Sequence, residues 1–340
     1  MTRTTTRSER RVFGPFLLAA LLVSACGVLR AQDQRVEGQF ERTATVSGAA
    51  DVHVTSGSGR IEVRTGDAGR IQVTARIVAD DRWSMRRGDL NAAERVRRIE
   101  ANPPFTQDGN RIRIGNLDAL DDEVTRNVSI SYVVTVPRDT TLVAGAGSGS
   151  VEIDGVARRV EVTTGSGSIR IRNAGADVNA RAGSGSISAD TVGGALDART
   201  GSGSIDGTGV AGAIRVTTGS GSIDVSQSGR GDAQASTGSG SIRLAGIRGA
   251  LRVTSTSGTI RIDGEQAGDW RLESTSGGVY VDLSGSPAFN LDARTRSGSI
   301  DLAYPVTMSG RLDKREVRGA VNGGGPLLEV RTSSGSIHIR

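Results

Sequence analysis

Residues 160–171, VEVTTGSGSIRI, contain the pattern that decides the fold of this chain. Two segments with alternating apolar residues flank a Gly-Ser-Gly-Ser corner, and such alternation is typical of half-buried β-strands. The pattern returns 18 residues later as VNARAGSGSISA (178–189) and again as LDARTGSGSIDG (196–207). A fixed period with a fixed corner predicts a repeat protein in which each copy is one structural unit.

The repeat extends in both directions from this stretch. Its steps are 18 residues from Leu142 to Ile214 and 18 to 21 up to Leu291, and we interpret a last step of 37 as two steps with one degenerate copy inside. One unit cannot bury its apolar side alone, whereas stacked units bury it between them. We therefore predict an all-β fold, a parallel β-solenoid (β-helix) of about 18-residue coils. The copies begin at Val52, Leu142, Val160, Val178, Leu196, Ile214, Ala233, Leu251, Trp270, Leu291 and Leu328.

The Gly-Ser corner is the most regular part of each coil. A position that is Gly in every copy indicates either a positive φ or a backbone approach too close for a Cβ atom. We interpret the corner as structural, with Ser hydroxyls stacked at the bend, because a phosphate-binding loop would be followed by Lys-Ser/Thr and a helix. The central corner residues are Ser166, Gly167, Ser184, Gly185, Ser202, Gly203, Ser220, Gly221, Ser239 and Gly240.

A second polar column precedes the corner. It is mostly Thr or Ser, as in Thr164, Thr200 and Thr218, and it has the parity of the apolar core positions. Inward hydroxyls would bond along the stack, whereas an exposed row would favour binding of ice or glycans. Parity predicts the inward arrangement.

Composition and charge exclude several classes of protein. The 48 Gly disfavour a helical bundle, and 3% aromatic residues are few for a compact α/β enzyme. The net charge is +5, but the first 25 residues contribute +3 of it, so the remainder is close to neutral. We therefore expect no nucleic-acid partner.

The N-terminus has the features of an export signal. A basic segment precedes the apolar run 12–23 (VFGPFLLAALLV), which is shorter than the ~20 residues of a spanning helix. The following VSACG (23–27) resembles the lipobox of bacterial lipoproteins, which implies lipidation of Cys26 after cleavage before it. The alternative is ordinary cleavage after Ala31. Cys26 is the only Cys, so no intramolecular disulfide can form.

The domain organisation follows from these features. We predict a lipoprotein signal peptide (1–25), a tether after the lipidated Cys26 (26–39) and a β-solenoid domain (40–340). Within the solenoid, residues 80–110 break the pattern and predict a short helix with Asp89 as N-cap, an insertion or cap over one end. Residues 304–327 are expected to form an irregular coil.

Residues 128–143 (VSISYVVTVPRDTTLV), the Gly-Ser coils and residues 323–340 (GGGPLLEVRTSSGSIHIR) resemble the bacterial "putative adhesin" family with β-strand repeats. This family is related to head-GIN adhesin domains, and its biochemical activity is unknown. The resemblance covers roughly residues 40–340 and implies an exported β-solenoid.

Few residues carry recognisable chemistry. His53 and His338 fall on outward positions, and we find no pattern of metal ligands and expect no cofactor. Asp206 and Asp224 should lie on adjacent coils, which is the spacing of a retaining glycosidase pair, although two solvated aspartates in a mixed-charge column also fit.

Two functional hypotheses remain. The first is a non-catalytic lipoprotein, exported and lipid-anchored in the bacterial cell envelope, that acts in adhesion or scaffolding. Its partners would be the membrane and a glycan or an envelope protein, and its oligomeric state stays open. The alternative is a carbohydrate-active β-helix enzyme.

Overall fold

The computed structural model describes residues 35–340 except 82–89, 117–119 and 308–313. The chain divides into the units Met1–Asp33 and Gln34–Arg340. The predicted signal peptide, Cys26 and residues 26–34 of the predicted tether lie outside the described residues. Within the described residues, no helix has both the length and the apolar character needed to cross a membrane.

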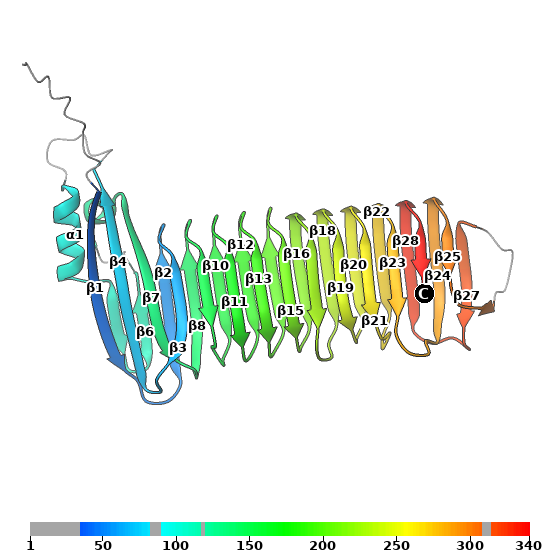
Figure 1. The fold of residues 1–340 in the computed structure, drawn as a ribbon, viewed down its shortest axis with the longest axis horizontal. Coiled ribbons are helices and arrows are strands. Elements are labelled where there is room, and N and C mark those ends of the chain that lie inside the picture. Colours follow the sequence, from blue (N-terminus) through cyan, green and yellow to red (C-terminus); the bar gives the residue numbers. More distant parts are fainter. Residues whose placement is uncertain (1–34, 82–89, 117–119, 308–313) are drawn as a thin grey trace, which may run out of the picture. The chain divides into compact units, whose positions relative to one another are not determined.

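Two large sheets face each other across one core in the second unit (Figure 1). In spatial order, the first sheet (sheet A) contains β1 (Arg35–Thr45), β4 (Arg70–Asp80), β7 (Val128–Pro137), β3 (Ile61–Gly66), β9 (Val151–Asp154), β11 (Ile169–Ala174), β13 (Ile187–Val192), β15 (Ile205–Val210), β17 (Ile223–Gln227), β19 (Ile242–Ile247), β21 (Ile260–Gly264), β23 (Val279–Leu283), β29 (Ile337–Ile339) and β25 (Ile300–Leu302).

The second sheet (sheet B) contains β26 (Val306–Thr307), β27 (Glu316–Val321), β24 (Phe289–Ser297), β28 (Leu327–Ser334), β22 (Trp270–Ser276), β20 (Leu251–Ser257), β18 (Ala233–Ser239), β16 (Ile214–Ser220), β14 (Leu196–Thr200), β12 (Val178–Ala182), β10 (Val160–Thr164), β8 (Thr140–Ala146), β2 (Ala50–Ser56), β6 (Arg111–Ile114) and β5 (Phe105–Asp108). Each regular coil contributes one strand to each sheet. The predicted solenoid is therefore confirmed.

The repeat columns stack in register. Val160 pairs with Leu142 on one side and Val178 on the other, and both strand directions are parallel. These side chains point into the core and are almost completely buried. Because identical positions superpose, the core consists of aliphatic ladders and needs few aromatic side chains.

The C-terminal coil does not stack at the end of the solenoid. Strand β28 lies between β22 and β24, so Leu328 pairs with both Trp270 and Leu291. The paired strand β29 likewise lies between β23 and β25. The last coil in the sequence is thus inserted between the two coils that precede it, as the red strands among the yellow and orange ones show in Figure 1.

The expected irregular coil at 304–327 is a different structure. Its strands β26 and β27 pair antiparallel with each other, and β27 pairs antiparallel with β24. The interpretation of the 37-residue step as two stacked coils is therefore wrong. The intervening strands β26 and β27 cover the edge of sheet B instead, and the chain then returns to the position between β24 and β22, where it forms β28.

The first coil shows the same inversion of order. Strands β2 and β3 lie between the coil β8–β9 and the strands β6 and β7, although β6 and β7 come later in the sequence than β3. Strand β4 then pairs antiparallel with the outer side of β7. Antiparallel strands consequently close both sheets at the N-terminal end and sheet B at the C-terminal end, which limits the pairing of exposed parallel edges there, whereas sheet A ends at the parallel strand β25.

The predicted helix is present within residues 80–110 as α1 (Ala92–Ala101), and a short α2 (Asp122–Thr125) follows it. The N-cap of α1 is Asn91, whose side chain accepts the Glu94 N–H at 2.8 Å, so the prediction of Asp89 as N-cap is wrong; Asp89 itself lies outside the described residues. Helix α1 packs against β1 and β4, the last strands of sheet A at this end.

Candidate functional site

The corner is held by hydroxyl groups of the column that precedes it. The Thr164 hydroxyl donates to the Gly149 carbonyl of the previous coil at 2.9 Å and accepts the Gly167 N–H at 3.2 Å. Thr200 and Thr218 donate to their previous coils in the same way, at 2.7 and 2.8 Å. The inward parity predicted for this column is confirmed.

The corner glycines are required by close contact between coils. A Cβ atom on Gly185 would lie 1.8 Å from the carbonyl oxygen of Gly167 in the coil below. Later in the stack a positive φ adds to this restriction, as at Gly240 with φ 148°. The corner serines Ser166, Ser184, Ser202, Ser220 and Ser239 are exposed, Gly167, Gly185 and Gly203 are buried, and Gly221 and Gly240 are half-buried.

The two histidines lie on outer faces, as their sequence parity predicts. The His53 Nε2 atom is 3.2 Å from a carboxylate oxygen of Asp51. The His338 ring stacks on Tyr280 with 4.9 Å between ring centroids, and its Nδ1 atom is 3.5 Å from Asp301. Sequence reasoning missed this cluster because the inserted position of the last coil alone places His338 between Tyr280 and Asp301.

Asp206 and Asp224 are neighbours on strands β15 and β17, as predicted. Both are exposed on the outer face of sheet A. Partial burial raises the pKa of Asp206, and the neighbouring Asp224 carboxylate raises it further. In the part of the chain that the structure describes, no group of three or more His, Cys, Asp or Glu side chains has an arrangement suited to a metal ion.

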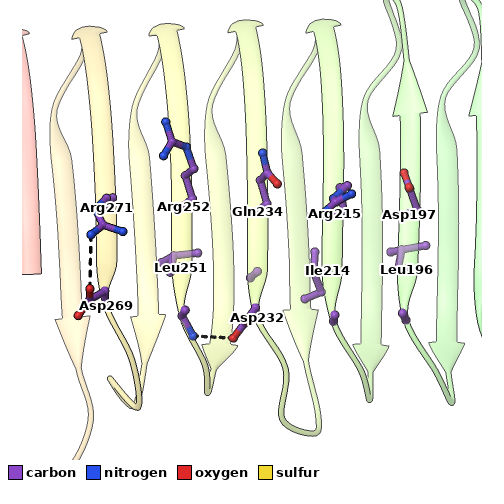
Figure 2. A pocket seen from close by; sticks show the side chains of 14 residues that line it. Leu196, Asp197, Ile214, Arg215, Asp232, Gln234, Leu251, Arg252, Asp269 and Arg271 are labelled. Atoms are coloured by element: carbon purple, nitrogen blue, oxygen red, sulfur yellow. Dashed lines mark hydrogen bonds and ion pairs between the residues drawn. The ribbon is translucent and has the colours of Figure 1, made fainter. Parts of the chain in front are cut away.

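The outer face of sheet B carries a groove of about 750 Å³. It runs across β14, β16, β18, β20 and β22, near the beginning of each strand. Figure 2 shows its main row of side chains at one level on successive strands. This row consists of Asp197, Arg215, Gln234, Arg252 and Arg271.

The two ends of this row are neutralised by neighbouring charges. Asp197 binds Arg199, with 3.0 Å between Oδ1 and Nε, and Arg271 lies 3.4 Å from carboxylate oxygens of both Asp269 and Glu329. Among the described residues, neither Arg215 nor Arg252 has a carboxylate oxygen within 4.0 Å. The middle of the groove therefore has two guanidinium groups available to an external anion.

Strand alternation places these residues on outward positions, and the sequence signal for the site is the order within that column, in which Arg215, Gln234, Arg252 and Arg271 follow each other without an acidic residue. The column order in the sequence does not separate Arg252 from Arg271, because Arg271 is paired by Asp269, two residues earlier, and by Glu329 of the inserted C-terminal coil.

Residues 124–340 match the family described as Toastrack DUF4097. The chain belongs to this family. The match covers more than half of the sequence, including every regular coil from β8 onward. No curated protein matches the chain at a significant level.

Solved structures with a similar arrangement of strands are distant in sequence. A Bacteroides fragilis protein described as a "putative adhesin" is 12% identical over 89% of this chain and 97% of its own, with a TM-score of 0.31. Two Parabacteroides distasonis proteins, described as a "putative adhesin" and a "putative lipid binding protein", are each 10% identical over the same shares, with TM-scores of 0.39 and 0.30.

Proposed function

We propose that this Toastrack protein is a non-catalytic lipoprotein of the bacterial cell envelope, exported and lipid-anchored, that acts in adhesion or envelope scaffolding. The observation that carries the proposal is the regular outer surface of the solenoid. In-register stacking repeats each outward position at about 4.8 Å from coil to coil. Such a surface presents many similar side chains at fixed intervals, which suits a repetitive partner.

The groove on sheet B supports a binding role more specifically. It lies on a rigid, fully paired sheet rather than on loops, so its side chains are held at constant spacing. Its unpaired Arg215 and Arg252 are polar groups directed to the exterior. A glycan or an envelope protein is the partner that we propose for this surface.

A screen of the full-length protein against immobilised glycans and envelope proteins tests the binding role. Saturable binding to at least one of them, lost on thermal unfolding, is the expected result. The absence of binding to every glycan and every envelope protein would contradict the proposal.

The lipid anchor is proposed from residues 23–27 and has its own test. A Cys26→Ser variant should leave the membrane fraction and should not incorporate labelled fatty acid, because the thioether needs the thiol. An Ala31→Leu variant is the matched control for ordinary signal cleavage. Membrane association and labelling that survive in Cys26→Ser would contradict the anchor.

A carbohydrate-active enzyme is the second candidate, and the Asp206–Asp224 pair favours it. The raised pKa of Asp206 beside the Asp224 carboxylate resembles the pairing of unlike carboxyl groups in a retaining glycosidase. The test is hydrolysis of extracellular polysaccharides by the full-length protein. Turnover that is abolished in Asp206→Asn and Asp224→Asn would replace the non-catalytic proposal with the enzymatic one.

A further inference from the structure

The hydrogen-bonding groups left open in the sheet B groove indicate the kind of group that it can bind. Arg215 and Arg252 each present a guanidinium group without a carboxylate partner among the described residues, whereas the groove carboxylates of Asp197, Asp232 and Asp269 already accept hydrogen bonds. Asp232 accepts the Ala250 N–H at 3.0 Å, and Asp269 accepts the Leu327 N–H at 3.0 Å in addition to its contact with Arg271. A planar guanidinium group binds a carboxylate through two parallel hydrogen bonds, so carboxylate groups fit these positions best.

The spacing of the two arginines indicates how often such groups should occur. Arg215 pairs in register with Gln234, and Gln234 pairs with Arg252, so the arginines are separated by two coils. Two strand spacings amount to about 10 Å between the backbones. This distance matches the length of two sugar units in an extended, β-linked chain, with Gln234 positioned to hydrogen-bond the uncharged unit between them.

The shape of the groove favours a polymer that crosses the strands. Its lining residues come from successive coils, and the floor beside the arginines contains the small side chains of Ala195, Ala213 and Ala250. An extended peptide usually pairs along the free edge of a sheet, which this groove does not offer. A nucleic-acid strand would require a denser row of positive charges than one per two coils.

We propose that this groove binds an acidic polysaccharide with one carboxylate per disaccharide, held by Arg215 and Arg252 as carboxylate-binding residues. The polysaccharide lies along the stack axis, across β16, β18 and β20. This inference rests on the proposed binding function and adds to it the ligand class and the residues that recognise it.

The experiment uses hyaluronan oligosaccharides, which carry one carboxylate per disaccharide, and chitin oligosaccharides of equal length as the neutral probe. Calorimetric titration of the full-length protein should show binding of hyaluronan that weakens with added salt, and no binding of chitin. The Arg215→Gln/Arg252→Gln variant should bind hyaluronan about tenfold more weakly, since two partly exposed charged contacts are lost.

The matched control is Arg170→Gln/Arg243→Gln. These arginines are also exposed and have no carboxylate oxygen within 4.0 Å among the described residues, but they lie on sheet A. An equal loss in both double variants would overturn the inference, because net charge alone would then explain binding. Failure to bind hyaluronan, with binding of a neutral glycan or an envelope protein retained, would overturn the inference and leave the proposed function intact. Failure to bind any of them would overturn both.

Discussion

The hydroxyl of Thr164 makes the sharpest prediction about stability. Its Oγ1 atom is the hydrogen-bond partner of two buried backbone groups, the Gly149 carbonyl and the Gly167 N–H. Thr164→Val keeps the side-chain shape but leaves both groups without a partner. Each such group costs about 1–3 kcal/mol, and the added methyl group regains about 0.8 kcal/mol. We expect the free energy of unfolding to fall by about 1–5 kcal/mol.

The adjacent Thr163 provides the matched control. It lies on the same strand, faces outward and is exposed, so Thr163→Val should change the unfolding free energy by less than about 0.5 kcal/mol. Urea unfolding followed by circular dichroism measures the difference. Because repeat arrays can unfold in parts, hydrogen exchange of the Gly167 amide should also be measured, and it should accelerate only in Thr164→Val. Equal urea midpoints and equal exchange in both variants would refute the role assigned to the hydroxyl column.

Three further predictions concern the corner, a strained residue of β13 and the acidic pair. Gly185→Ala should lower the free energy of unfolding in urea by more than about 3 kcal/mol, because its Cβ atom would lie 1.8 Å from a backbone oxygen. Gly145→Ala is the control and should cause a much smaller loss, because the nearest atom to its Cβ would be 3.7 Å away. Thr191 adopts φ 58°, which is unfavourable for a β-branched residue. Thr191→Asn should therefore increase the free energy of unfolding by about 1 kcal/mol and raise the melting temperature. An unchanged or lower melting temperature would contradict the strain. Burial and the neighbouring Asp224 carboxylate raise the pKa of Asp206, so its ionisation costs more in the folded than in the unfolded protein, and stability is lost as pH rises from the ordinary pKa of aspartate through the raised one. Asp206→Asn should therefore increase the urea midpoint at pH 7 and have no such effect below the ordinary pKa, and an equal effect at both pH values would exclude ionisation of Asp206 as the cause.

Much of the candidate binding surface could be derived from the sequence column by column. The outward parity of Arg215, Gln234 and Arg252 follows from strand alternation, and their adjacency follows from the 18- to 19-residue steps. Their availability could not be derived from the column, because pairing depends on local acids such as Asp269, two residues before Arg271, and on Glu329, which the inserted C-terminal coil places beside Arg271. The groove itself depends on which side chains lie beside the small residues Ala195, Ala213 and Ala250, which precede three of its five strands.

The sequence by itself determined the coil and its register. An apolar column such as Leu142, Val160 and Val178 can be buried only if identical positions superpose, and Gly185 allows the approach that superposition requires. The order of the coils at both ends was decided only by the tertiary structure. Coils with equivalent columns can stack on one another in any order, so local pattern does not specify which neighbours Leu328 meets. The inserted arrangement is accompanied by the antiparallel pairs β4–β7 and β24–β27 near the two ends, which are contacts between segments far apart in the chain.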